Sequence, residues 1–203
     1  MARRFLIATP ALFACLWACL AQDAYQREAA RLSTFLNWQP GSVVAEIGAG
    51  QGQFTLIAAE RVGAAGRVYT TELDAGKFAH LQEIAADHKN ITALRAAEAQ
   101  TNLPPDCCDS IWMRLVYHHF VKPAEMDASL FRSLKPGGRL AVIDEEPKPG
   151  SSRVAGVPEN RGGHGVPQKI LIAELTAAGF EVAKISDDWS DGDYCVVFRK
   201  PAP

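Results

Sequence analysis

The stretch Glu46-Ile47-Gly48-Ala49-Gly50-Gln51-Gly52 comes at the end of a short apolar run, Val43–Ile47. Such a run predicts a buried strand, and the glycines predict a turn into a helix over Phe54–Val62. Glycines at this kind of turn let the backbone approach a ligand, and the helix N-terminus offers free amides. The dinucleotide-binding fingerprint requires a glycine where this chain has Gln53. The turn is therefore expected to bind another ligand, and acidic Glu46 suits a cationic group better than a pyrophosphate.

Strand-like and helix-like segments alternate along the rest of the chain. Lys135–Gly138 is expected to be a turn and Glu146–Val166 a loop, because both are rich in proline or glycine. Alternation of this kind implies a parallel sheet with helices on both faces. The other expected strands are Arg67–Leu73, Ile91–Ala96, Ser110–Leu115 and Arg139–Ile143, and the expected helices are Asp23–Leu36, Ala75–His88, Ala124–Leu134 and Gln168–Ala178.

The last two expected strands are Phe180–Ser186 and Tyr194–Arg199. Only Asp187–Asp193 joins them, which is too short for a parallel crossover. They are therefore expected to form an antiparallel hairpin at the sheet edge. The predicted fold class is α/β, a Rossmann-like three-layer sandwich with a mostly parallel seven-stranded sheet that ends in this hairpin.

These motifs, together with others from about residue 30 to 200, resemble those of class I S-adenosylmethionine-dependent methyltransferases, especially the small-molecule, type 11-like members. The family's first motif is an acid-x-Gly-x-Gly-x-Gly turn. Glu72 then ends the second strand, Ala97-Glu98-Ala99 follows the third, Leu103-Pro104 and Asp109 precede the fourth, and Leu134–Leu140 leads into the fifth.

The resemblance implies S-adenosyl-L-methionine as cofactor. Glu72 would accept both ribose hydroxyls, as a carboxylate at this position can, and Glu98 would lie near the adenine amine. Two alternatives stay open: Glu72 is a solvated carboxylate at a strand end, and Glu46 only orders the turn. The predicted cofactor-binding residues are Glu46, Gly48, Ala49, Gly50, Gly52, Glu72 and Glu98.

Tyr117-His118-His119-Phe120 follows the fourth strand, at the sheet edge where such folds bind ligands. Histidine can take a proton near neutral pH, so His118 and His119 are the candidate catalytic residues. The alternative is that one caps the next helix and the other packs. Arg114 is expected either to meet an anionic substrate or to pair with Asp144, and His164 to line a lid. The candidate residues of the substrate cleft are Arg114, Tyr117, Asp144, Glu145 and His164.

The predicted reaction is methyl transfer to an oxygen, nitrogen or sulfur nucleophile. The acceptor is expected to be small, because no accessory domain is evident that could bind a macromolecule. No metal ligands are assigned, since Cys107 and Cys108 lack the paired spacing of a zinc site. Two other functions are considered. One is a non-catalytic exported module with the same fold, and the other is a nicotinamide-dependent oxidoreductase.

The 203 residues carry a formal net charge of −2, which does not indicate nucleic acid as a partner. Arg3-Arg4 precedes an apolar run that ends in Cys19-Leu20-Ala21, as in a secretory signal. We therefore expect export to a periplasmic or extracellular location. A membrane would be a partner only through an uncleaved or lipid-modified leader, and a cytoplasmic protein with a packed helix is the alternative. The predicted organisation is a leader (1–21), an N-terminal helix (22–42) and a methyltransferase domain (43–203).

Overall fold

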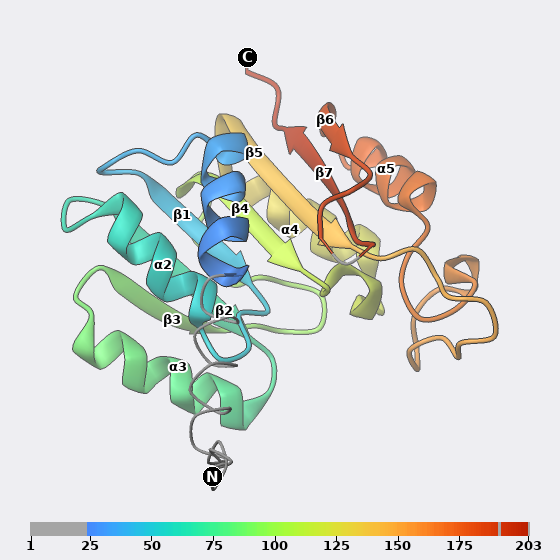
Figure 1. The fold of residues 1–203 in the computed structure, drawn as a ribbon, viewed down its shortest axis with the longest axis horizontal. Helices are drawn as coiled ribbons and strands as arrows, with labels where there is room; N and C mark the ends of the chain where they lie inside the picture. Colours follow the sequence, from blue (N-terminus) through green and yellow to red (C-terminus); the bar gives the residue numbers. More distant parts are fainter. Residues whose placement is uncertain (1–23, 191, 203) are drawn as a thin grey trace, which may run out of the picture.

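The computed structural model describes residues 24–190 and 192–202, so the predicted leader lies outside the described residues. Its centre is a seven-stranded sheet in the order β3-β2-β1-β4-β5-β7-β6 (Figure 1). Strands β1 to β5 pair in parallel, whereas β7 is antiparallel to both β5 and β6. The predicted fold class is confirmed. The strands are β1 (Val43–Ile47), β2 (Arg67–Glu72), β3 (Ile91–Arg95), β4 (Cys108–Arg114), β5 (Leu134–Asp144), β6 (Glu181–Ser186) and β7 (Tyr194–Arg199).

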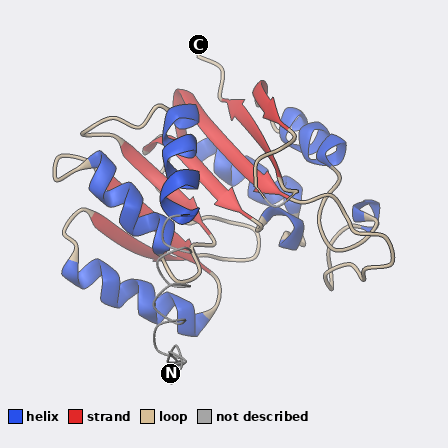
Figure 2. Ribbon diagram, viewed as in Figure 1, coloured by secondary structure: helices blue, strands red, loops and turns tan. Residues whose placement is uncertain are grey.

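Helices cover both faces of this sheet, which makes the three layers visible in Figure 2. Neighbouring strand residues point to opposite faces. Trp112 of β4 accordingly packs with the N-terminal helix (24–36) and α2, while Ile111 and Met113 pack with α4 and α5. None of the described helices is long and apolar enough to cross a membrane. The helix bounds are α2 (Gln53–Val62), α3 (Ala75–Asp87), α4 (Pro123–Ser133) and α5 (Gln168–Ala177), with 3-10 turns η1 (Tyr117–His119) and η2 (Glu159–Arg161).

The segment Lys135–Gly138 is not the separate turn that its composition predicts, because β5 already begins at Leu134. Gly137 adopts a left-handed φ of 78° and donates its N–H to the Lys200 carbonyl, and the Lys200 N–H donates to Gly138. The register against β4 shifts at this point. Glycine thus allows an irregular start to the strand while its backbone groups stay paired.

The strand order places β1 and β4 side by side, with the connections that follow them leaving in opposite directions along the sheet. Open α/β sheets bind ligands outside the carboxyl ends of the strands at such a switch point. The glycine turn after β1, Glu72 at the end of β2 and the Tyr117–Phe120 segment after β4 therefore all face one region. The fold positions the predicted site residues there.

Candidate active site

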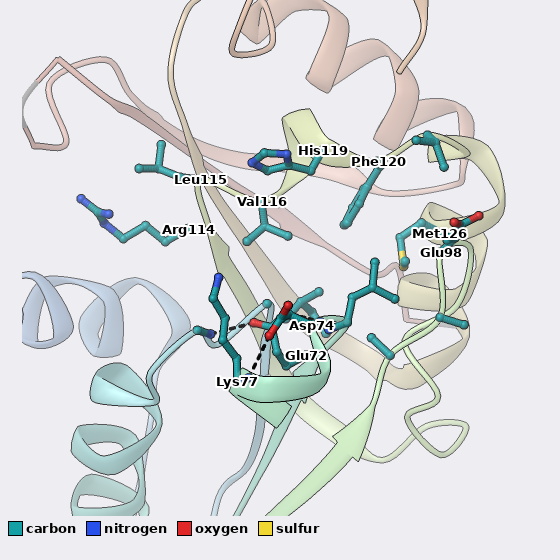
Figure 3. Close-up of a pocket in the computed structure, with 17 residues that line it drawn as sticks. Glu72, Asp74, Lys77, Glu98, Arg114, Leu115, Val116, His119, Phe120 and Met126 are labelled. Atoms are coloured by element: carbon teal, nitrogen blue, oxygen red, sulfur yellow. Dashed lines mark hydrogen bonds between the residues drawn. The ribbon is translucent and has the colours of Figure 1, made fainter. Parts of the chain in front are cut away.

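A cleft of about 670 Å³ lies at the carboxyl ends of β1, β2, β3 and β4 (Figure 3). Glu72, Asp74 and Lys77 line one side of this cleft, and His119 and Phe120 line another. The volume is within the usual range for small-molecule sites. Of the predicted site residues, the cleft brings together Gly48, Gly50, Glu72, Glu98, Arg114 and His119.

The three glycines of the turn, Gly48, Gly50 and Gly52, all have left-handed backbones, and the first two line the cleft. Gly48 has φ 68°, and a Cβ there would lie 2.6 Å from the Val116 side chain. Gly50 has φ 58°, and a Cβ there would meet no atom within 4 Å. Position 48 thus requires glycine for both space and conformation, and the turn at Gly50 leaves the backbone open to a ligand.

Glu72 is held in place by backbone amides. Its Oε2 accepts a hydrogen bond from the Gly50 N–H at 3.0 Å, and its Oε1 accepts from Leu73 at 2.8 Å and Asp74 at 3.0 Å. The residue is only 8% exposed, so the alternative of a solvated strand-end carboxylate is wrong. An ionised carboxylate offers about four acceptor positions. The acceptor position of Glu72 that these three amides leave free can bind a ligand that donates hydroxyl hydrogens.

Glu46, Ala49 and Gly52 do not line the cleft. Glu46 is 5% exposed beneath the turn, where its carboxyl accepts a hydrogen bond from the Thr55 hydroxyl. Burial raises the pKa of Glu46 to about 8, so this carboxyl is largely neutral at pH 7. The geometry favours the alternative in which Glu46 orders the turn, and not the direct attraction of a cationic ligand.

Three histidines meet at the other end of the site. The ring of His118 lies 4.2 Å from that of His119 and 4.6 Å from that of His164, measured between centroids. His119 lines the cleft, whereas His118 is 2% exposed behind it. Partial burial and the neighbouring imidazoles lower the pKa of His119, which keeps this ring neutral at pH 7. The sequence predicts the importance of each histidine but not their proximity.

Two consecutive carboxylates at the end of β5 hold two of these rings. Asp144 is fully buried, and its Oδ1 lies 2.6 Å from Nδ1 of His118. Glu145 Oε1 lies 3.1 Å from Nδ1 of His164. Asp144 and Glu145 were predicted to line the substrate cleft. The structure places both behind the imidazoles, where they can orient rings that face a ligand.

Tyr117 does not belong to the cleft as predicted. Its side chain is fully buried on the α4 and α5 side of the sheet, and its hydroxyl lies 2.9 Å from both Asp127 and Glu174. Burial raises the pKa of Asp127 to about 7, so this carboxyl can share a proton with its neighbours. Tyr117 and Asp127 form a buried polar contact between η1 and α4. Nothing in the sequence near Tyr117 indicates these distant partners.

Arg114 lines the cleft but does not pair with Asp144. Its Nε donates to Glu28 of the N-terminal helix at 3.0 Å, and its Nη2 lies 3.6 Å from Asp193. The next residue, Leu115, also lines the cleft and has a φ of 54°. This conformation is strained for a bulky residue, and such strain is common at binding sites. No sequence signal marks Leu115.

The central part of the chain, residues 45–142, matches the model of a methyltransferase domain family. This match identifies residues 45–142 as a methyltransferase domain. The match begins on β1 and ends within β5, so it contains the glycine turn, Glu72 and both histidines of η1. S-adenosylmethionine is the cofactor that the sequence motifs predict for such a domain. The open turn and the anchored carboxylate described above fit it.

Solved structures with the methyltransferase fold resemble this chain over most of its length. An S-adenosylmethionine-dependent methyltransferase from Aquifex aeolicus is 20% identical, with a TM-score of 0.69, over 85% of this chain and 89% of its own. The geranyl diphosphate C-methyltransferase of Streptomyces coelicolor is 14% identical, with a TM-score of 0.67, over 86% and 80%. A Bordetella parapertussis protein described as "a possible exported protein" is 19% identical, with a TM-score of 0.67, over 89% and 68%. A search of curated protein sequences finds no significant match.

Proposed function

We propose that this methyltransferase transfers a methyl group to an oxygen, nitrogen or sulfur atom of a small acceptor bound beside His119. The observation that carries the proposal is the single cleft that connects Glu72 and the glycine turn with His119. Cofactor and acceptor can therefore share one cleft. Its volume of about 670 Å³ leaves little room for a macromolecular acceptor inside it.

The bound cofactor supplies a methyl group on a cationic sulfur. The contribution of the protein is mainly to align the acceptor with that group, which removes much of the entropic barrier. Glu72 fixes one end of the arrangement, because three backbone amides hold its carboxylate. Gly50 leaves the approach to the turn open.

The cleft has an apolar lining beside its polar groups. Val116, Phe120, Val121 and Met126 line it together with His119. This lining suits a molecule with an apolar part and one nucleophilic heteroatom near the imidazole. The solved neighbour from Streptomyces coelicolor, whose structure contains geranyl diphosphate, provides a precedent for a small acceptor with an apolar chain.

His119 is the better candidate for direct contact with the acceptor, because His118 is buried behind it. The proton of a hydroxyl or thiol nucleophile must leave at or before transfer, and a neutral imidazole can receive it. His118, held by Asp144, would then act as a positioning residue for its neighbour.

A labelled-methyl assay tests the proposed reaction. The full-length protein is incubated with S-adenosylmethionine carrying a deuterated methyl group and with a panel of small alcohols, phenols, thiols and amines. We expect mass spectrometry to find the label on a member of one acceptor class. We also expect His119→Gln to lower the turnover number by about a hundredfold, while His88→Gln, a change at the C-terminal end of α3, leaves it unchanged. Equal turnover in both variants would contradict the role of His119.

A further inference from the structure

We propose that His118, His119 and His164 form a binding site for a divalent transition-metal ion of the zinc class at the acceptor end of the cleft. Each imidazole offers one nitrogen, and the three nitrogens lie within 4.8 Å of one another. Two of the rings come from η1, and the third comes from the loop between β5 and α5. The fold therefore brings together ligands that are 45 residues apart in the sequence (164 − 119).

His118 provides the most fixed of the three nitrogens. Its Nδ1 is engaged by Asp144 at 2.6 Å, and its backbone N–H donates to the other oxygen of the same carboxylate at 3.2 Å. Its Nε2 is buried and has no hydrogen-bond partner among the described residues. A buried nitrogen without a partner is costly and indicates a missing ligand. A carboxylate on one nitrogen and a metal ion on the other is the usual arrangement for a metal-binding histidine.

His164 repeats this arrangement. Glu145, the residue after Asp144, lies 3.1 Å from Nδ1 of His164 and leaves Nε2 for a ligand. The glycines on either side of His164 hold it against the end of β5, since a Cβ on Gly165 would lie 2.6 Å from the Glu145 carbonyl oxygen. The backbone N–H of His164 also donates to Ser151 at 2.9 Å. Two consecutive carboxylates thus orient two imidazoles toward the same point.

The distances require a modest contraction when an ion binds. A tetrahedral zinc ion with Zn–N bonds of about 2.0–2.1 Å holds its ligand nitrogens about 3.3 Å apart. His119 and His164 can supply the movement because both side chains are partly exposed, while His118 stays fixed. Imidazole ligands favour zinc, copper, nickel or iron over magnesium or calcium. Three protein ligands leave one coordination position open, as in catalytic zinc sites.

The open coordination position is expected to face the cleft, because His119 lines it. This part of the inference rests on the proposed function, and in the metal-loaded protein the ion would take over from His119 the task of removing the acceptor's proton. An acceptor with an alcohol, phenol or thiol group would bind there as its anion, and its proton would pass to solvent, because such an ion lowers the pKa of a bound hydroxyl or thiol. The acceptor's lone pair then forms the bond to the methyl carbon. The electron pair of the breaking carbon–sulfur bond stays on the sulfur, so atoms and charge balance.

Calorimetric titration of the full-length protein with Zn²⁺ tests the site. We expect one ion per chain and a loss of affinity of about tenfold or more in His119→Ala and in His164→Ala. His80→Ala, at an exposed histidine on α3, is the matched control and should bind like the unchanged protein. Mg²⁺ should not bind. Circular dichroism and S-adenosylhomocysteine affinity, both expected to be unchanged in His164→Ala, show that this variant is folded.

The Co²⁺-loaded protein identifies the ligand atoms, because the chain also has cysteines that could hold zinc. The expected spectrum has tetrahedral d–d bands and no thiolate-to-cobalt charge-transfer band. A thiolate band, or equal Zn²⁺ affinity in the unchanged protein, His119→Ala and His164→Ala, would overturn the metal site. These outcomes leave the proposed methyl transfer intact. Conversely, a protein that binds Zn²⁺ through these histidines but methylates no acceptor contradicts only the proposed function.

Discussion

Asp144 is a fully buried carboxylate on which three donors converge. The backbone N–H and Nδ1 of His118 and the backbone N–H of Glu145 all lie within hydrogen-bond distance of it. Because Asp144 holds His118 without facing the cleft, it is a positioning residue. An asparagine in its place keeps only one accepting oxygen, so its NH₂ group cannot accept from the donor or donors that bind the other carboxylate oxygen.

We therefore expect Asp144→Asn to weaken Zn²⁺ binding by about ten- to a hundredfold, the usual effect of removing such a partner. The affinity for S-adenosylhomocysteine should not change, since Asp144 does not line the cleft. Calorimetry with both ligands measures the two effects separately. Asp87→Asn, at an exposed position on α3, is the control. Parallel loss of both affinities would show that Asp144 maintains the fold and does not act through His118.

The burial of Glu46 predicts that the free energy of unfolding depends on pH. Its pKa is about 8 in the folded protein, against an ordinary value of 4.5, because the side chain is buried. Between these values the folded state holds a proton that the unfolded state lacks, so the free energy of unfolding falls as pH rises. Glu46→Gln removes this dependence and should flatten the slope by up to about 1.4 kcal/mol per pH unit.

Chemical denaturation at pH 5 to 8.5 measures the slope for both proteins. Glu60→Gln, at an exposed position on the neighbouring helix α2, should leave the slope unchanged. An identical pH dependence in the unchanged protein and Glu46→Gln would mean that Glu46 is ionised in the fold. Direct attraction of a cationic ligand by Glu46 would then be the better explanation of the acidic position before the turn.

Single residues differ in how far the sequence predicts their roles. Glu72 could be predicted because its type and its place at a strand end are both local in the sequence. Tyr117 could not, because its burial depends on Asp127 and Glu174, which reach it from two separate helices. The histidine cluster was missed for the same reason. His164 joins the other two only through the path of a long loop, and no spacing rule describes that path.

At the scale of elements, the loop between β5 and α5 decides where His164 lies. Gly162 and Gly165 both have left-handed backbones, with φ of 78° and 106°. A Cβ on Gly162 would meet nothing within 4 Å, whereas a Cβ on Gly165 would collide with the backbone at Glu145 and Glu146. An alanine at either position would therefore have a strained backbone, but only the alanine at position 165 would also collide with neighbouring atoms.

Gly165→Ala should displace the loop from the end of β5 and lower Zn²⁺ affinity by about tenfold or more, as for loss of one oriented ligand. Gly162→Ala carries the same type of backbone strain without the collision and should keep the affinity. Calorimetry on both variants makes the comparison. A similar Zn²⁺ affinity in the two would indicate that the loop does not fix His164.

The regular elements were the most predictable part of the fold. Each of the seven strands was expected within a few residues of its position, because a short apolar or β-branched run bounded by turn residues is a local pattern. The sequence does not predict the start of β5, because Pro136, Gly137 and Gly138 are typical of a turn when their hydrogen-bond partners are unknown. The pairing of Gly137 and Gly138 with Lys200 becomes visible only when β7 returns beside β5.

At the scale of the whole molecule, the N-terminal sequence predicts where the protein is located in the cell. Arg3-Arg4 and the apolar run after them favour export. We expect cell fractionation to find the protein outside the cytoplasm, and N-terminal sequencing to show loss of about residues 1–21. A soluble cytoplasmic protein that retains Met1 would contradict export. The methyltransferase assignment would not be affected.

The central claim is that the cleft binds the cofactor through Glu72 and the glycine turn. Titration calorimetry of S-adenosylhomocysteine into the full-length protein tests it most directly, with Glu72→Gln and the exposed control Glu83→Gln measured alongside. We expect one saturable site for S-adenosylhomocysteine and no binding of NAD. We also expect the affinity for S-adenosylhomocysteine to fall by about ten- to a hundredfold in Glu72→Gln and not in Glu83→Gln, because hydrogen bonds to a charged group are lost. A folded protein that gives no binding heat with S-adenosylhomocysteine, or that binds it equally well without the Glu72 carboxylate, would contradict the account.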